Sequence, residues 1–78
     1  MAGDDDSGMR MRIERDIASF YSSVESADTS GAAGKVIEMA RMYASDAKSY
    51  LEKGDLYTAF SCISYAHGML DALKEMGD

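Results

Sequence analysis

The sequence predicts an all-α fold, an up-down-up three-helix bundle. Apolar residues recur at intervals of three and four along most of the chain, no segment alternates with a period of two, and proline is absent. A chain of 78 residues forms one small domain, which buries a modest fraction of its surface. We expect a disordered acidic leader over residues 1–8 and a single domain over residues 9–78, with helices at about 9–26, 31–53 and 55–76.

The first expected helix follows the acidic leader MAGDDDSG. Its apolar residues are spaced by four, four, three and four positions, which places them on one face: Met9, Ile13, Ile17, Phe20 and Val24. The small, glycine-containing stretch SADTSGAAG at residues 26–34 indicates the joint to the next helix. Asp28, Thr29 or Ser30 could cap that helix, because a side-chain oxygen at this position accepts a hydrogen bond from a free backbone N–H.

The second and third helices are predicted to form an antiparallel hairpin. The apolar face of the second has a heptad-like spacing: Val36, Ala40, Tyr43, Ala47, Tyr50 and Leu51. The face of the third is broader: Leu56, Ala59, Phe60, Ile63, Ala66, Leu70 and Leu73. Between them, Lys53 complements a helix C-terminus, Gly54 suits the left-handed conformation just after it, and Asp55 suits the next N-cap. A joint this short requires the two helices to run antiparallel.

Charge and composition exclude several functions. The chain has 14 acidic and 8 basic residues, a formal net charge of -6, so we expect no nucleic-acid partner and no binding to an anionic membrane. No apolar run approaches the ~20 residues that span a bilayer. The leader lacks the apolar segment of a secretory signal. These observations predict a soluble, cytoplasmic protein.

The sequence contains one cysteine, Cys62, and one histidine, His67. A disulfide within the chain is therefore excluded, and one cysteine with one histidine fall short of a structural zinc set. A reactive thiol needs a neighbouring cation, and the sequence places none beside Cys62, so a small core residue is the favoured interpretation. We expect no metal and no cofactor.

The strongest candidate for a polar site is the stretch YAHGMLD, residues 65–71. His67 lies at one edge of the apolar face, with Asp71 one turn later. Folding the hairpin about Gly54 brings His67 level with residues 41–43, which predicts a polar cluster: Tyr43, Asp46, Tyr50, His67 and Asp71. In one interpretation the cluster satisfies a partly buried His67 and fixes the register of the two helices. In the other it is a small-molecule or metal site, in which His67 is a ligand or a general base. No nucleophile or phosphate-binding pattern accompanies His67, so we favour the first and assign no catalytic residue.

A strip of small side chains runs beside the main apolar face of the third helix: Ser61, Ser64, Gly68 and Ala72. Glycine inside a helix costs about 1 kcal/mol relative to alanine, so Gly68 indicates that another backbone approaches closely. The first helix, a second copy of the chain and a ligand are the candidates for this contact. Met11, Met42 and Met69 are expected to be peripheral, and exposed methionines suit a binding surface.

Residues 43–77, a little under half of the chain, resemble domain-of-unknown-function family 357, a family of small archaeal proteins. The residues in common are Tyr43, Asp46, Ala47, the KGD turn, Ala59, Phe60 and the string YAHG-x-LDA. The family often has an aromatic residue after the glycine of that string, where this chain has Met69. The resemblance implies a short helical bundle and an archaeal, intracellular source, and it implies no reaction.

Two functions from different classes follow as hypotheses. The first is a non-enzymatic module that binds another protein or itself, because the bundle is small and acidic and carries the small-residue strip without a catalytic pattern. An accessory domain that works beside a separately encoded enzyme is a variant of this hypothesis. The alternative is a small-molecule or metal-binding site, extending to a catalytic one, on the hairpin around His67.

Overall fold

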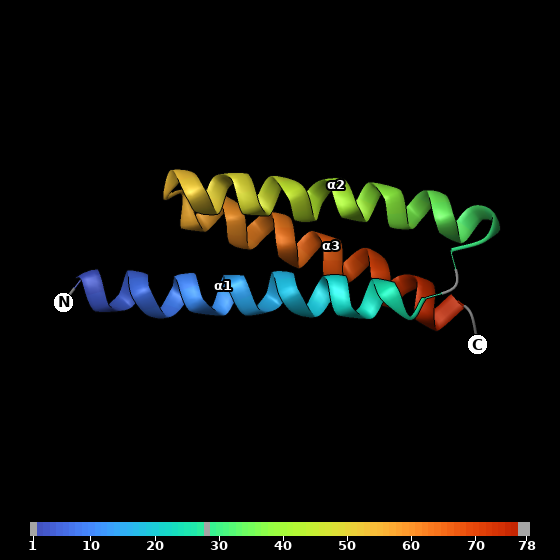
Figure 1. The fold of residues 1–78 in the computed structure, drawn as a ribbon, viewed down its shortest axis with the longest axis horizontal. Helices are drawn as coiled ribbons and strands as arrows, with labels where there is room; N and C mark the ends of the chain where they lie inside the picture. The colour runs from blue at the N-terminus through green and yellow to red at the C-terminus, as the bar shows by residue number, and fades with distance from the viewer. Residues whose placement is uncertain (1, 28, 77–78) are drawn as a thin grey trace.

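The structure is a bundle of three helices, which confirms the predicted fold class (Figure 1). The computed structural model describes the backbone of residues 2–27 and 29–76 and the side chains of residues 7–27 and 29–75. Its helices follow one another in this order: α1 (Ala2–Glu25), α2 (Gly31–Lys53) and α3 (Leu56–Met76). No strand occurs within these described ranges. Figure 1 shows α1 and α3 running in one direction and α2 in the other, which is the up-down-up order.

The helix boundaries agree with the prediction except at the start of α1. This helix begins at Ala2, ahead of the predicted residue 9, so the leader that was expected to be disordered is helical from Ala2 onward. The Nη1 atom of Arg10 donates to the carbonyl of Leu51 at 3.0 Å, so Arg10 lies level with the last turn of α2. The turns of α1 before Arg10 therefore extend past the α2–α3 turn (Figure 1). Residues 1, 28 and 77–78 lie outside the described residues.

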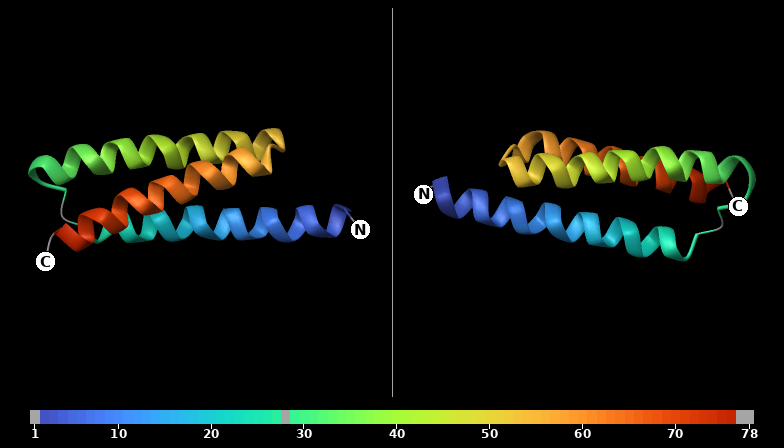
Figure 2. Two further views of the ribbon diagram at one scale, coloured as in Figure 1. Left: turned by 180° about the vertical axis from the view of Figure 1, so that it is seen from behind. Right: turned by 45° about the horizontal axis from the view of Figure 1, so that its top comes forward.

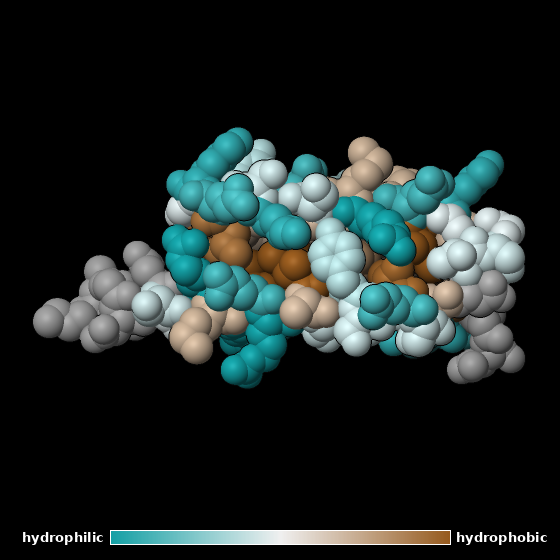
Figure 3. Space-filling model, in the orientation of Figure 1, coloured by the Kyte–Doolittle hydropathy of each residue, from teal (hydrophilic) through white to brown (hydrophobic). Residues whose placement is uncertain are grey.

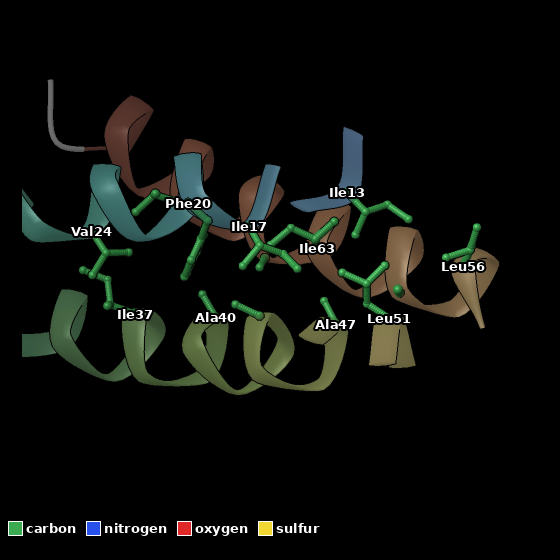
Figure 4. Packing of buried hydrophobic residues seen from close by; sticks show 14 residues of the cluster. Ile13, Ile17, Phe20, Val24, Ile37, Ala40, Ala47, Leu51, Leu56 and Ile63 are labelled. Carbon is green, nitrogen blue, oxygen red and sulfur yellow. The ribbon is translucent and has the colours of Figure 1, made fainter. Parts of the chain in front are cut away.

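One apolar core runs along the inside of the bundle (Figure 4). Its buried side chains come from all three helices: Ile13, Ile17, Phe20, Val24, Ile37, Ala40, Ala44, Ala47, Leu51, Leu56, Ala59, Ile63, Ala66 and Leu70. The predicted face of α2 is rotated in the structure, because Ile37 and Ala44 are buried whereas Val36, Tyr43 and Tyr50 are half-buried. The buried residues of α2 include three alanines, Ala40, Ala44 and Ala47, whereas Tyr43 and Tyr50 pack half-buried against the core.

The turn between α2 and α3 has the predicted chemistry. Gly54 adopts a left-handed conformation with φ of 85°, which a residue without a Cβ accepts at little cost. The N–H of Gly54 donates to Leu51 and that of Asp55 to Tyr50, the two hydrogen bonds of a Schellman motif. Asp55 then caps α3, accepting hydrogen bonds from the backbone N–H of Thr58 at 3.1 Å and its hydroxyl at 2.7 Å. These hydrogen bonds from Thr58 lower the pKa of the Asp55 carboxyl.

The joint between α1 and α2 depends on a glycine inside the helix. Ser30, one of the three predicted candidates, occupies the N-cap position of α2, but its side chain does not make the predicted capping hydrogen bond. A Cβ added at Gly34 would overlap the backbone carbonyl of Thr29. The chain therefore folds back closely over the first turn of α2, and Gly34 leaves the space for it.

The third helix crosses the other two at an angle. Seen from behind in the left view of Figure 2, α3 lies in front, beginning beside α2 and ending beside α1. Helices α2 and α3 form the most extensively packed pair, as expected for a hairpin. One long side of α3 therefore faces the core, and the opposite side faces away from both other helices.

Candidate functional site

His67 joins α3 to α1. Its Nε2 atom lies 2.8 Å from the backbone carbonyl oxygen of Asp16, and its ring meets the ring of Phe20 edge-on, with centroids 5.8 Å apart. A carbonyl oxygen only accepts hydrogen bonds, so Nε2 carries the proton and donates it. His67 is half-buried and holds the register of α3 against α1.

The expectation that His67 faces α2 is therefore wrong. The sequence places His67 at one edge of the apolar face of α3, and in the folded bundle that edge adjoins α1. The contact partners are consequently a backbone carbonyl and Phe20, neither of which belongs to the predicted cluster. The favoured interpretation, that His67 serves packing, matches this geometry with a different partner helix.

The other members of the predicted cluster lie elsewhere. The ring of Tyr43 meets the ring of Tyr65 on α3 at 4.7 Å between centroids, and Asp46 lies exposed beside it. Tyr50 is near the end of α2, where the Lys53 ammonium sits 5.2 Å from its ring centroid. Asp71 is exposed. Among the described residues, no three His, Cys, Asp or Glu side chains come together as a metal site would require.

Cys62 has the surroundings of a structural thiol. It is half-buried against the core. Burial raises the pKa of the Cys62 thiol, and the negative charges of Asp46 and Asp55 raise it further. The thiolate is the nucleophilic form, so this environment disfavours a reactive cysteine.

The small-residue strip faces solvent along its whole length. Ser61, Ser64, Gly68 and Ala72 are all exposed, and a Cβ added at Gly68 would meet no atom within 4 Å. The expectation that α1 could pack on this strip is therefore wrong, because α1 contacts α3 at the edge that carries His67. Among the described residues, none lies close enough to position 68 to require a glycine there.

Two tyrosines complete the surface on which the strip lies. Tyr57 and Tyr65 are 79% and 58% exposed, both high values for aromatic residues. We call this surface the outer face of α3 and define it by six residues: Tyr57, Ser61, Ser64, Tyr65, Gly68 and Ala72. The two tyrosines are not among the site residues predicted from the sequence, although their spacing from Ser61 and Gly68 follows the periodicity of a helix.

Five of the six residues that define the outer face of α3, all except Ala72, lie in a stretch of sequence without charge. Residues 56–70 contain no Asp, Glu, Lys or Arg, although charged residues make up 28% of the chain. No other stretch of this chain without charged residues is as long. Solvent-facing sides of helices normally carry charged residues, whereas the centres of protein interfaces are depleted of them and enriched in tyrosine and methionine.

Helix α2 extends this surface. Through the contact of Tyr43 with Tyr65, the outer face of α3 continues onto α2. There Met39 and Met42 are 52% and 67% exposed and line a shallow hollow of about 210 Å³ with Tyr43 and Asp46. The expectation that Met42 is peripheral is confirmed, and Met69 is half-buried.

A separate groove lies between α1 and α2. It has a volume of about 430 Å³ and is lined by Arg10, Glu14, Ile17, Ala18, Tyr21, Lys48, Leu51 and Glu52. Figure 3 shows apolar atoms in the gap between α1 and α2 on this side of the molecule. Two polar contacts cross it: Arg10 donates to Leu51, and the Lys48 ammonium lies 5.8 Å from the ring centroid of Tyr21. The groove is thus bridged by its own side chains.

Comparison with known protein families identifies the family of this chain. The model of the family described as "Protein of unknown function (DUF357)" matches residues 10–78, which include α2, α3 and the part of α1 from Arg10 onward. The chain belongs to this family. No curated protein and no solved structure matches it. The DUF357 assignment agrees with the resemblance found in residues 43–77 and extends it over α1, and it carries no reaction. Within the described residues, no helix is long and apolar enough to cross a membrane.

Proposed function

We propose that this DUF357 protein is a non-enzymatic helical module that binds another protein chain through the outer face of α3. The observation that carries the proposal is this exposed face itself, uncharged over four helical turns and flanked by Tyr57 and Tyr65. A helix face that only contacts water gains nothing from this composition. A helix face that packs on another protein does, because burial of apolar and aromatic surface drives association.

The alternative of a ligand site around His67 has less support. A shared site needs its side chains to converge, and here they diverge. His67 is bonded to α1, Tyr43 and Asp46 lie beside Tyr65, and Tyr50 is at the far end of the hairpin beside Lys53. The proposal therefore assigns His67 to stability and the outer face of α3 to binding.

Site-specific photocrosslinking in cells of the native host tests the proposal. The photoreactive amino acid p-benzoylphenylalanine replaces Ser61 at the centre of the outer face, and in a matched control it replaces Ser22, an exposed serine on α1. Irradiation is expected to give protein adducts at position 61 and not at position 22. The adducts should disappear when Tyr57→Ser is added. No adduct at position 61, or equal yields at both positions, would overturn the proposal.

A further inference from the structure

We infer that the chain which binds the outer face of α3 is a second copy of this chain, with the two α3 helices antiparallel and related by a two-fold axis between residues 62 and 63. This inference rests on the proposed function and names its partner. It follows from three properties of the face: its pattern of large and small residues, its lack of charge, and its size.

The pattern of large and small residues is complementary to itself. Tyr57 and Gly68 are eleven residues apart, about three helical turns, so they lie on the same line of α3 about 16 Å apart. In an antiparallel pair centred between residues 62 and 63, Tyr57 of each copy comes level with Gly68 of the other, and Ser61 comes level with Ser64. The space above Gly68 is open in the single chain. The ring of Tyr57 from the second copy would fill it, and symmetry would repeat the contact.

Charge favours this face over the rest of the surface for self-association. Each copy has a formal net charge of -6, so two copies repel one another. Residues 56–70 contain no carboxylate, so contact between these stretches of the two copies brings no two carboxylates together within them. A basic partner, by contrast, would be attracted to the acidic surface elsewhere and would gain no electrostatic attraction at this face.

The two exposed tyrosines supply about one third of the area that a standard interface buries on each partner. A standard interface buries about 800 Å² on each partner, roughly 15% of the 5355 Å² surface of the chain. With about 200 Å² for a tyrosine side chain, the exposed fractions of Tyr57 and Tyr65 together supply about 270 Å². The two-fold axis places both α2 helices on the same side of the α3 pair, so Met39 and Met42 of each copy extend the interface along that side.

Sedimentation equilibrium of the purified chain tests the inference. A species of twice the 8.5 kDa chain mass is expected, and its association should strengthen as salt is raised, because salt screens the repulsion between the acidic copies. Tyr57→Ser and Gly68→Leu should each weaken association at least tenfold, whereas Ser22→Leu, a matched exposed change on α1, should leave it unchanged. Circular dichroism verifies the fold of each variant, and the open space at Gly68 accommodates leucine in the single chain.

Disulfide trapping tests the antiparallel register. In a Cys62→Ser background, a Tyr57→Cys chain mixed with a Gly68→Cys chain should form a linked heterodimer under mild oxidation, because a disulfide requires Cα atoms within about 7 Å. Either chain alone should remain unlinked. Self-linking of the Tyr57→Cys chain would overturn the register, since it would indicate a parallel pair.

The two proposals fail in different ways. A chain that stays at 8.5 kDa up to millimolar concentration overturns the inference. If position 61 still gives adducts with a different protein in cells, the proposed function stands and only the identity of the partner is wrong. If neither association is observed, both are wrong.

Discussion

Replacing His67 by alanine tests the contact that joins α3 to α1. The substitution removes the hydrogen bond from Nε2 to the carbonyl of Asp16 at 2.8 Å and the edge-on contact with the ring of Phe20 at 5.8 Å. The carbonyl of Asp16 keeps its hydrogen bond within α1, because a carbonyl oxygen has two lone pairs and the helix uses one. No buried acceptor is left unsatisfied, so the loss is limited to the contacts themselves.

The expected loss of stability is about 2 kcal/mol. A hydrogen bond of this kind contributes about 1 kcal/mol net, and an edge-to-face aromatic contact contributes about 0.5–1.5 kcal/mol beyond its buried area. For a domain of this size, 1 kcal/mol shifts the melting temperature by about 4–8 °C. We therefore expect His67→Ala to lower the melting temperature by about 10 °C.

Urea and thermal unfolding, followed by circular dichroism, measure the effect. His67→Phe keeps a ring beside Phe20 and loses only the hydrogen bond, so it should cost about 1 kcal/mol. Asp71→Ala, at the exposed position that the sequence had placed beside His67, should change stability by less than about 0.5 kcal/mol. If His67→Ala matched the wild type, or Asp71→Ala cost as much as His67→Ala, the assignment of this contact to α1 would be refuted.

Three further predictions concern the two joints and the outer face of α3. Gly34→Ala should lower the free energy of unfolding by about 1–3 kcal/mol in urea titrations, because the new Cβ overlaps the backbone of Thr29; a neutral result would mean that the joint relaxes freely. Gly68→Ala should raise it by up to about 1 kcal/mol in dilute solution, where single chains predominate, since the position is open and alanine favours helix; a loss of stability would show that another part of the chain contacts Gly68. The pKa of the Asp55 carboxyl is lower in the folded chain than in the unfolded chain. The stabilisation that the ionised carboxylate provides is therefore present above pH 4 and is lost as the pH falls through the pKa of the folded chain. The melting temperature of Asp55→Ala should be below that of the wild type at pH 7, and the difference should shrink toward pH 2.

Most of the fold could be predicted because its determinants are local. The intervals of apolar residues, the absence of proline and the KGD turn predicted α2 and α3 to within one residue. Gly54 and Asp55 act through hydrogen bonds to residues within five positions, so their roles do not depend on the rest of the molecule. The buried face of α2 was predicted less well. Which of its residues are fully buried, such as Ala44, and which are half-buried, such as the tyrosines, depends on how closely the neighbouring helices approach.

The candidate site could be predicted only in part. The strip around Gly68 was recognised from its small residues. The spacing of those residues in the sequence did not determine whether the strip contacts α1 or is exposed to solvent. The hydrogen bond of Arg10 could not be predicted, because its acceptor is the backbone carbonyl of Leu51, 41 residues away, and the sequence does not indicate which side chain a backbone carbonyl will contact. The hydrogen bond from His67 to the carbonyl of Asp16 could not be predicted for the same reason, since the identity of a residue does not determine which side chain contacts its backbone.

The sequence by itself determined three helices, the antiparallel hairpin with its turn, and the edge of the apolar face of α3 that carries His67. Only the tertiary structure decided which neighbour each edge meets. Three helices joined by short turns can be arranged with either hand, and the two arrangements exchange the neighbours of α3 while keeping every apolar face in the core. In the hand observed, His67 meets α1, Tyr65 meets Tyr43 on α2, and Gly68 points away from both.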